Sequence, residues 1–219
     1  MLRSSFLNDL NQLKVDLNKM CYLVIKQLEN GIDAFKNDDK ELAKTVILKD
    51  KEVNDMERKI EAACLNLILR QQPIARDLRD ISTALKIVTD LERIGDQIAD
   101  ICETIIRLNA KHAFKMVEDI PEMAEIATKM VRDAIQSFND NDIILAKEVK
   151  LRDDRVDELF NNVKLELVEI TKNAPDQIDA CIEFTIIAKY LERIGDHAVN
   201  ICEWTEFQET GEMDHTRLI

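Results

Sequence analysis

The sequence predicts an all-α protein made of two tandem, internally duplicated antiparallel three-helix bundles. Composition is the first indication, because the 219 residues include only four Gly, three Pro and 5% aromatic residues, with 33% charged residues, as in helical proteins. The second is spacing: apolar residues recur every three or four positions, as in Leu7, Leu10, Leu13 and Leu17, and no useful length alternates like a strand. The third is a repeat, since the same six residues, LERIGD, begin at Leu91 and at Leu191.

Capping signals divide the chain into six helices. Asp38 is followed three residues later by Glu41, an arrangement typical of a capping box at a helix start. The cluster from Asn139 to Asp142 offers the same signal in the second half, and the three prolines lie near expected helix starts, where a missing N–H costs little. The predicted helices span residues 4–36, 38–70, 74–109, 119–139, 141–173 and 175–209.

The two halves align with each other. AFKNDDKELAKTVILKDKEVN from Ala34 matches SFNDNDIILAKEVKLRDDRVD from Ser137 without a gap, at an offset of 103, and the third helix matches the sixth at an offset of 100. We therefore predict a first bundle over residues 1–112 and a second over residues 113–219. Because no Pro/Gly-rich linker separates them, we expect the bundles to pack end to end.

Charge and cysteine content restrict the partners and the compartment. A net charge of −13 argues against nucleic acid, because no basic stripe is available to contact phosphates. Five cysteines, an odd number with no C-x-x-C pair, are typical of a reducing compartment. No apolar run is long enough for a membrane span, and the start turns polar too early for a signal peptide. These features predict a cytoplasmic protein that does not insert into membranes.

The repeated LERIGD element carries an acidic strip. On a helical wheel its acidic residues fall within about 80° of one another, opposite a wide apolar face. The strip consists of Glu92, Asp96, Asp100 and Glu103 in the first half, and of Glu192, Asp196, Asn200 and Glu203 in the second. Like charges one turn apart and a mid-helix glycine both destabilise a helix. Gly95 and Gly195 lie beside the strips, where a missing side chain allows a neighbouring helix to come close.

Helix register adds carboxylates from a second helix in each half. If the second and third helices are antiparallel around a turn near residue 72, Asp50 lies level with Glu92 and Asp96. Around a turn near residue 174, Asp153 and Asp157 lie level with Glu192 and Asp196. Such clusters must raise their pKa values, spread apart or bind a cation. An all-oxygen ligand set suits Mg²⁺, Ca²⁺, Mn²⁺, iron and, less typically, Zn²⁺. The alternative is a solvated acidic face with a helix-crossing glycine.

These motifs resemble those of a known family. LERIGDHAVNICEW, preceded by RQQPIARDLR and KDKEVNDMERKIEAACL, resembles the PhoU family of regulators of bacterial phosphate transport and phosphate signalling, over essentially the whole chain. The resemblance implies a cytoplasmic pair of three-helix bundles whose E-x-x-x-D motifs bind metal ions. It also implies a non-enzymatic, negative regulatory role between the Pst phosphate ABC transporter and a membrane sensor histidine kinase.

Carried over to this chain, the resemblance matches its two motifs to Glu92 with Asp96 and to Glu192 with Asp196. Asn200 fits the amide that the family usually has one turn later, whereas the first half departs from that pattern with Asp100. The predicted metal ligands are Asp50, Glu92, Asp96, Asp100, Asp153, Asp157, Glu192, Asp196 and Asn200. The predicted cofactors are divalent or trivalent ions, namely iron, manganese, magnesium or zinc.

The sequence therefore predicts a metal-binding regulator of phosphate uptake that forms a homodimer or a partner-bound oligomer. A purely structural helical adaptor without metal is the alternative. A di-iron enzyme is disfavoured, because its E-x-x-H spacing occurs only at Glu212 and His215, in a polar tail. We expect His197, beside Asp196 but off the strip, to lie at the surface or to contact a partner.

Overall fold

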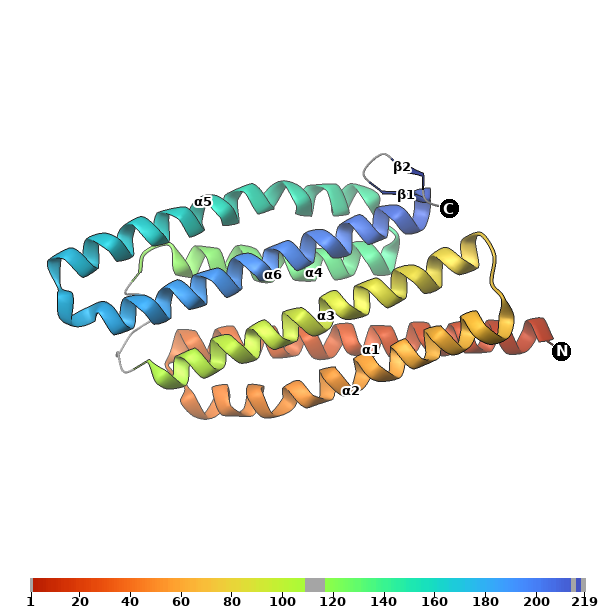
Figure 1. The fold of residues 1–219 in the computed structure, drawn as a ribbon, viewed down its shortest axis with the longest axis horizontal. Helices are drawn as coiled ribbons and strands as arrows, with labels where there is room; N and C mark the ends of the chain where they lie inside the picture. Colours follow the sequence, from red (N-terminus) through yellow and green to blue (C-terminus); the bar gives the residue numbers. More distant parts are fainter. Residues whose placement is uncertain (1, 109–116, 214–215, 218–219) are drawn as a thin grey trace.

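The computed structural model describes residues 2–108, 117–213 and 216–217, which form six long helices and a small C-terminal hairpin (Figure 1). The helices are α1 (Leu2–Asn37), α2 (Lys40–Gln71), α3 (Arg76–Arg107), α4 (Ile120–Asp140), α5 (Ile143–Asn173) and α6 (Ile178–Thr210). A 3₁₀ turn, η2 (Pro175–Gln177), precedes α6, and β1 (Glu212–Met213) pairs antiparallel with β2 (Thr216–Arg217). The all-α prediction is confirmed, and the predicted helix ends lie within a few residues of the observed ones.

The helices form two three-helix bundles, as predicted. Helices α1, α2 and α3 pack against one another, and α4, α5 and α6 do the same. One continuous apolar core runs through both bundles, and Ile98 of α3 and its counterpart in α6, Ala198, are both fully buried in it. Burial of a large aliphatic side chain stabilises the fold by about 1.5–3 kcal/mol. The predicted boundary after residue 112 falls within residues 109–116, outside the part of the chain that the structure describes.

The bundles lie side by side, so the predicted end-to-end packing is wrong. Helices α3 and α6 run antiparallel along each other and form most of the contact, with α1 and α4 behind them in Figure 1. The physical reason is a second apolar face on both helices. Isoleucine recurs every seventh residue, at Ile87, Ile94 and Ile101 and again at Ile187, Ile194 and Ile201, and all six are fully buried. A seven-residue repeat is the pattern with which two helices pack lengthwise.

Polar contacts fix the register of this junction. Gln208 Nε2 donates to Asp80 Oδ1 at 3.0 Å near one end, and Arg107 Nη2 donates to Glu183 Oε2 at 3.1 Å near the other. This antiparallel register places Ile94 level with Ile194, the equivalent position in the other half. The junction is therefore approximately two-fold symmetric about these two isoleucines.

The helix starts differ from the prediction in one detail. Asp39, rather than Asp38, caps α2, because its Oδ1 accepts hydrogen bonds from the backbone N–H groups of Glu41 and Leu42. Asp38 adopts a left-handed conformation with φ 56° between the two helices. In the second half, Asp142 caps α5 in the same way. Among the described helices, none is both long and apolar enough to cross a membrane.

Candidate metal centres

Each bundle brings an acidic strip on one helix close to a carboxylate on its neighbour. A Cβ atom placed on Gly95 of α3 would lie 3.4 Å from Asp50 Oδ1 of α2 and 3.3 Å from Val53 Cγ1. A Cβ on Gly195 of α6 would lie 3.2 Å from Asp153 Oδ1 of α5. Both glycines therefore allow the close helix approach that the sequence predicts. We call the α2–α3 cluster the first centre and the α5–α6 cluster the second centre.

In the first centre, amides hold the α2 carboxylate in place. Asp50 Oδ1 accepts a hydrogen bond from Gln27 Nε2 of α1 at 3.0 Å, and Asp50 Oδ2 accepts one from Asn54 Nδ2 at 2.9 Å. Across from it, Glu92 is 15% exposed and its Oε2 is buried without a hydrogen-bond partner. The Arg93 guanidinium lies 3.5 Å from Glu92 Oε2 and 3.5 Å from Asp96 Oδ2, which compensates part of the charge.

These carboxylates repel one another. Burial, followed by the charges of Asp96 and Glu57, raises the pKa of Glu92 to about 7. Burial and then the charge of Asp50 also raise the pKa of Asp96. Asp50, Glu92 and Asp96 therefore form one electrostatically coupled group, as the register argument predicts.

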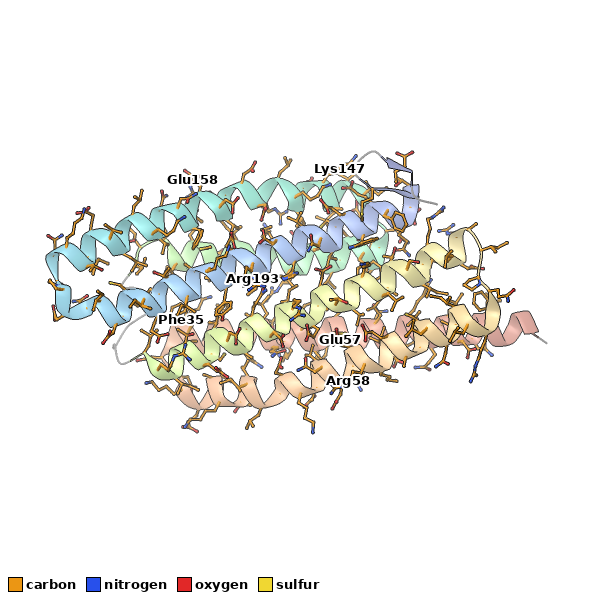
Figure 2. All side chains as sticks on the ribbon, viewed as in Figure 1. Phe35, Glu57, Arg58, Lys147, Glu158 and Arg193 are labelled. Atoms are coloured by element: carbon orange, nitrogen blue, oxygen red, sulfur yellow. The ribbon has the colours of Figure 1, made fainter. Side chains whose placement is uncertain are left out.

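Glu57 of α2 also belongs to this group, although the repeat in the sequence does not predict it. It lies on the side of α2 that faces α3 (Figure 2), and its charge contributes to the raised pKa of Glu92. Burial, and then the charge of Glu61, raises the pKa of Glu57 itself. Its spacing of two helical turns from Asp50 places it on the same face. The duplication hid it, because the equivalent residue in the second half is Phe160.

The second centre combines four of the predicted residues, Asp153, Asp157, Glu192 and Asp196. Burial, followed by the charges of Asp196, Asp157 and Glu192, raises the pKa of Asp153 to about 6. Asp153 Oδ1 is buried and has no hydrogen-bond partner. The pKa of Asp196 is raised by burial and then by Glu192, while Glu192 pairs with Lys189 Nζ at 2.5 Å.

Asp100 and Asn200 have other partners. Asn200 Nδ2 donates to Asp90 Oδ1 of the other bundle at 3.0 Å, and His197 Nδ1 lies 2.8 Å from the same oxygen. At the equivalent place in the other half, burial and then a hydrogen bond with Asp100 raise the pKa of Tyr190. The structure therefore places Asn200 at the junction of the bundles, whereas Asp100 reaches both the junction and the first centre, since its charge also helps to raise the pKa of Asp96. His197 is 16% exposed at the junction and lies against Asp90 of the same chain, so it is half-buried rather than at the surface, and a contact with a partner stays a prediction.

The donor atoms suit a hard cation, although the side chains are not gathered around one point. Within residues 2–108, 117–213 and 216–217, no three His, Cys, Asp or Glu side chains are arranged closely enough to hold a metal ion. Each centre nevertheless offers several carboxylates at one level, and the buried oxygens Glu92 Oε2 and Asp153 Oδ1 lack hydrogen-bond partners. These oxygens are acceptors that a cation would satisfy. Side-chain rotation must bring the carboxylates together for an ion to bind.

Comparison with known proteins identifies the family. The PhoU domain family model matches residues 17–105 and 120–205, one match in each bundle. The chain belongs to the PhoU family. A PhoU homologue from Clostridium acetobutylicum, named a phosphate-specific transport system accessory protein, is 38% identical over 212 residues, covering 96% of this chain and 97% of the relative. PhoU homologue 1 of Thermotoga maritima, which has the same description, is 34% identical, covering 94% of this chain and 89% of the relative.

Solved PhoU structures share the whole architecture. The crystal structure of PhoU from Pseudomonas aeruginosa matches with a TM-score of 0.88 and 32% identity, covering 94% of this chain and 100% of that chain. The phosphate transport system regulatory protein PhoU from Streptococcus pneumoniae matches with a TM-score of 0.86 and 27% identity, covering 95% and 98%. The resemblance that the LERIGD motifs indicate is thus confirmed over both bundles.

Proposed function

We propose that this protein is a non-catalytic cytoplasmic regulator of inorganic phosphate uptake. It acts on components of the phosphate ABC transporter and on a membrane sensor histidine kinase, and represses the phosphate-starvation response. Membership of the PhoU family supports the connection with phosphate transport, because the relatives are named accessory or regulatory proteins of that system. An acidic surface suits binding to basic segments of protein partners, and we propose that the working form is a homodimer.

We further propose that both centres bind divalent or trivalent metal ions. The ligands would be drawn from Asp50, Glu57, Glu92 and Asp96 in the first centre, and from Asp153, Asp157, Glu192 and Asp196 in the second. A bound cation there would neutralise carboxylates that now raise one another's pKa. The observation that carries this proposal is the buried, unpartnered oxygen of Asp153, surrounded by the charges of Asp157, Glu192 and Asp196.

One observation favours the alternative of a purely structural helical adaptor. As placed, no three acidic, His or Cys side chains of the described residues converge on one point. The two proposals differ in metal content. Protein purified without chelator should contain metal by elemental analysis, and Glu92→Ala combined with Glu192→Ala should remove most of it. Wild-type protein without metal would support the structural adaptor.

The regulatory role has a separate test. Deleting the gene should raise the output of a phosphate-starvation reporter in cells grown at high phosphate, because a repressor is lost. Complementation with the wild-type gene is the control and should restore the low output. A reporter that stays low in the deletion strain contradicts the regulatory proposal, whatever the metal content of the protein.

A further inference from the structure

Gln27 of α1 reaches the first centre from behind. It is 5% exposed, and its Nε2 donates to Asp50 Oδ1 at 3.0 Å and to the carbonyl oxygen of Gly95 at 3.3 Å. One amide therefore links α1 to both helices that carry the first centre. The other amide atom, Gln27 Oε1, is buried and has no hydrogen-bond partner.

Met130 of α4 occupies the equivalent place behind the second centre. It lies 103 residues after Gln27, the offset that relates the two halves. A Cβ on Gly95 would lie 3.2 Å from Gln27 Oε1, and a Cβ on Gly195 would lie 3.6 Å from Met130 Cε. Met130 is fully buried but donates no hydrogen bond, and Asp153 Oδ1 beside it has no partner. The fold thus accepts a thioether at this position.

The unpaired amide oxygen of Gln27 lowers the stability of the fold. A buried amide oxygen without a partner is unfavourable; methionine, with a similar length, avoids that cost but gives up the hydrogen bonds to Asp50 and Gly95. What the amide supplies is a fixed orientation for Asp50, since Gln27 holds one carboxylate oxygen while Asn54 holds the other. Hydrogen bonds behind a metal-binding carboxylate orient it for the ion, and their loss typically lowers metal affinity about 10–100-fold.

We propose that Gln27 is a positioning residue for a cation at the first centre, and that Met130 leaves the second centre without this support. The two centres therefore differ in how tightly they hold an ion, through residues on α1 and α4 that do not touch it. This inference rests on the proposed metal binding. It adds that the identity of one buried residue behind each centre sets the affinity of that centre.

The test isolates each centre in the full-length protein. Glu192→Gln with Asp196→Asn leaves only the first centre, and Glu92→Gln with Asp96→Asn leaves only the second. Chelator-treated protein is titrated with Mn²⁺ alone, and free Mn²⁺ is followed by electron paramagnetic resonance. Gln27→Met and Met130→Gln are then added to each background, so that each variant makes one half resemble the other.

Gln27→Met should weaken Mn²⁺ binding at the isolated first centre about tenfold or more, and should change the isolated second centre less than threefold. Met130→Gln should strengthen the isolated second centre only. Equal affinities with and without Gln27→Met at the first centre would overturn the inference, as would equal losses at both centres. If neither parent background binds Mn²⁺, the proposed metal function itself fails, a result distinct from parents that bind and variants that do not differ.

Urea unfolding of the metal-free protein distinguishes an effect of Gln27 on metal affinity from an effect on the stability of the fold. Gln27→Met removes the unpaired oxygen together with the hydrogen bonds to Asp50 and Gly95, so its urea midpoint reports what the residue contributes to stability, independently of Mn²⁺ affinity. A lowered midpoint together with unchanged Mn²⁺ affinity would contradict the proposal. If Met130→Gln does not fold, the Mn²⁺ affinities of Gln27→Met in the two backgrounds still test whether Gln27 acts on the first centre alone.

Discussion

Asn200 of α6 donates a hydrogen bond from Nδ2 to Oδ1 of Asp90 of α3, at 3.0 Å, across the junction between the bundles. Asp90 is 8% exposed, and His197 Nδ1 also contacts this oxygen. A buried carboxylate with two polar partners helps to specify the register of two helices whose seam is otherwise apolar. The junction, rather than a metal centre, is therefore where the structure uses Asn200.

Replacing Asn200 should weaken folding without removing metal. Asn200→Ala leaves Asp90 buried with one partner fewer, so we expect the free energy of unfolding to fall by about 1–3 kcal/mol, measured by urea denaturation. Metal content measured by elemental analysis should match the wild type. Asp196→Ala is the matched control and should lose metal from the second centre. Equal metal loss in both variants would return Asn200 to the ligand set.

The fold followed from the sequence because each helix carries its own local signals. The repeated offset of Ala34 and Ser137 gave the duplication, and the Asp142 cap and the three prolines marked helix starts close to those observed. The arrangement of the bundles did not follow from these signals. Two apolar faces on one helix, as on α3 at Ile94 and Ile98, look like one wide face on a wheel, and only the partner helix shows which face packs inside the bundle.

The candidate centres were predictable in their carboxylates but not in their surroundings. Register alone brought Asp50 level with Glu92, since both helices are regular and antiparallel. The wheel angle placed Asp100 at the edge of the strip, where its charge helps to raise the pKa of Asp96 while its side chain also reaches Tyr190 of the neighbouring bundle. No sequence pattern marks Gln27 as part of the first centre. It lies on a third helix, α1, and only the tertiary packing shows that this helix reaches the centre.

Stability should fall as pH rises through the range in which the raised carboxyls ionise. The pKa of Glu92 is raised from 4.5 to about 7 and that of Asp153 from 3.8 to about 6, in each case chiefly by burial. Between these ordinary and raised values the folded protein retains protons that the unfolded chain has released. The free energy of unfolding contributed by these groups is thus greatest below pH 4 and is lost by about pH 7. Urea titrations in chelator at pH 5 and pH 8 measure it.

Glu92→Gln is the control for this pH effect, because the amide cannot ionise. The stability of the variant relative to the wild type should increase from pH 5 to pH 8 in chelator. A constant difference across this range would show that Glu92 does not titrate as described. If the centres bind Mn²⁺, the ion competes with these protons, so the stabilisation by Mn²⁺ should be larger at pH 8 than at pH 5.

Glycine at position 31 should tolerate alanine less well than glycine at position 195. A Cβ on Gly31 would lie 2.6 Å from Ile98 Cγ2, so the buried Ile98 side chain or one of the two helices must shift, whereas the shortest contact at Gly195 is 3.2 Å, to Asp153 Oδ1. Overpacking of a core costs about 1–3 kcal/mol, against a gain of about 1 kcal/mol from helix propensity. Gly31→Ala should therefore melt below the wild type, and Gly195→Ala at or above it, by differential scanning calorimetry. The reverse order would contradict the described α1–α3 approach.

Of the two lysines at the start of α2, we expect Lys40 to stabilise the first bundle more than Lys44 does. Its Nζ donates to the carbonyl oxygens of Ile106 at 3.0 Å and Leu108 at 2.8 Å, at the C-terminal end of α3. Carbonyls there have no helical partner and form the negative end of the helix dipole, which a cation stabilises. Lys40→Met should lower the free energy of unfolding by about 1.5–3 kcal/mol. Lys44→Met breaks only an exposed pair with Glu41 and should cost about 0–1 kcal/mol. Equal urea midpoints for the two variants would show that the charge of Lys40, rather than its two carbonyl contacts, accounts for its effect.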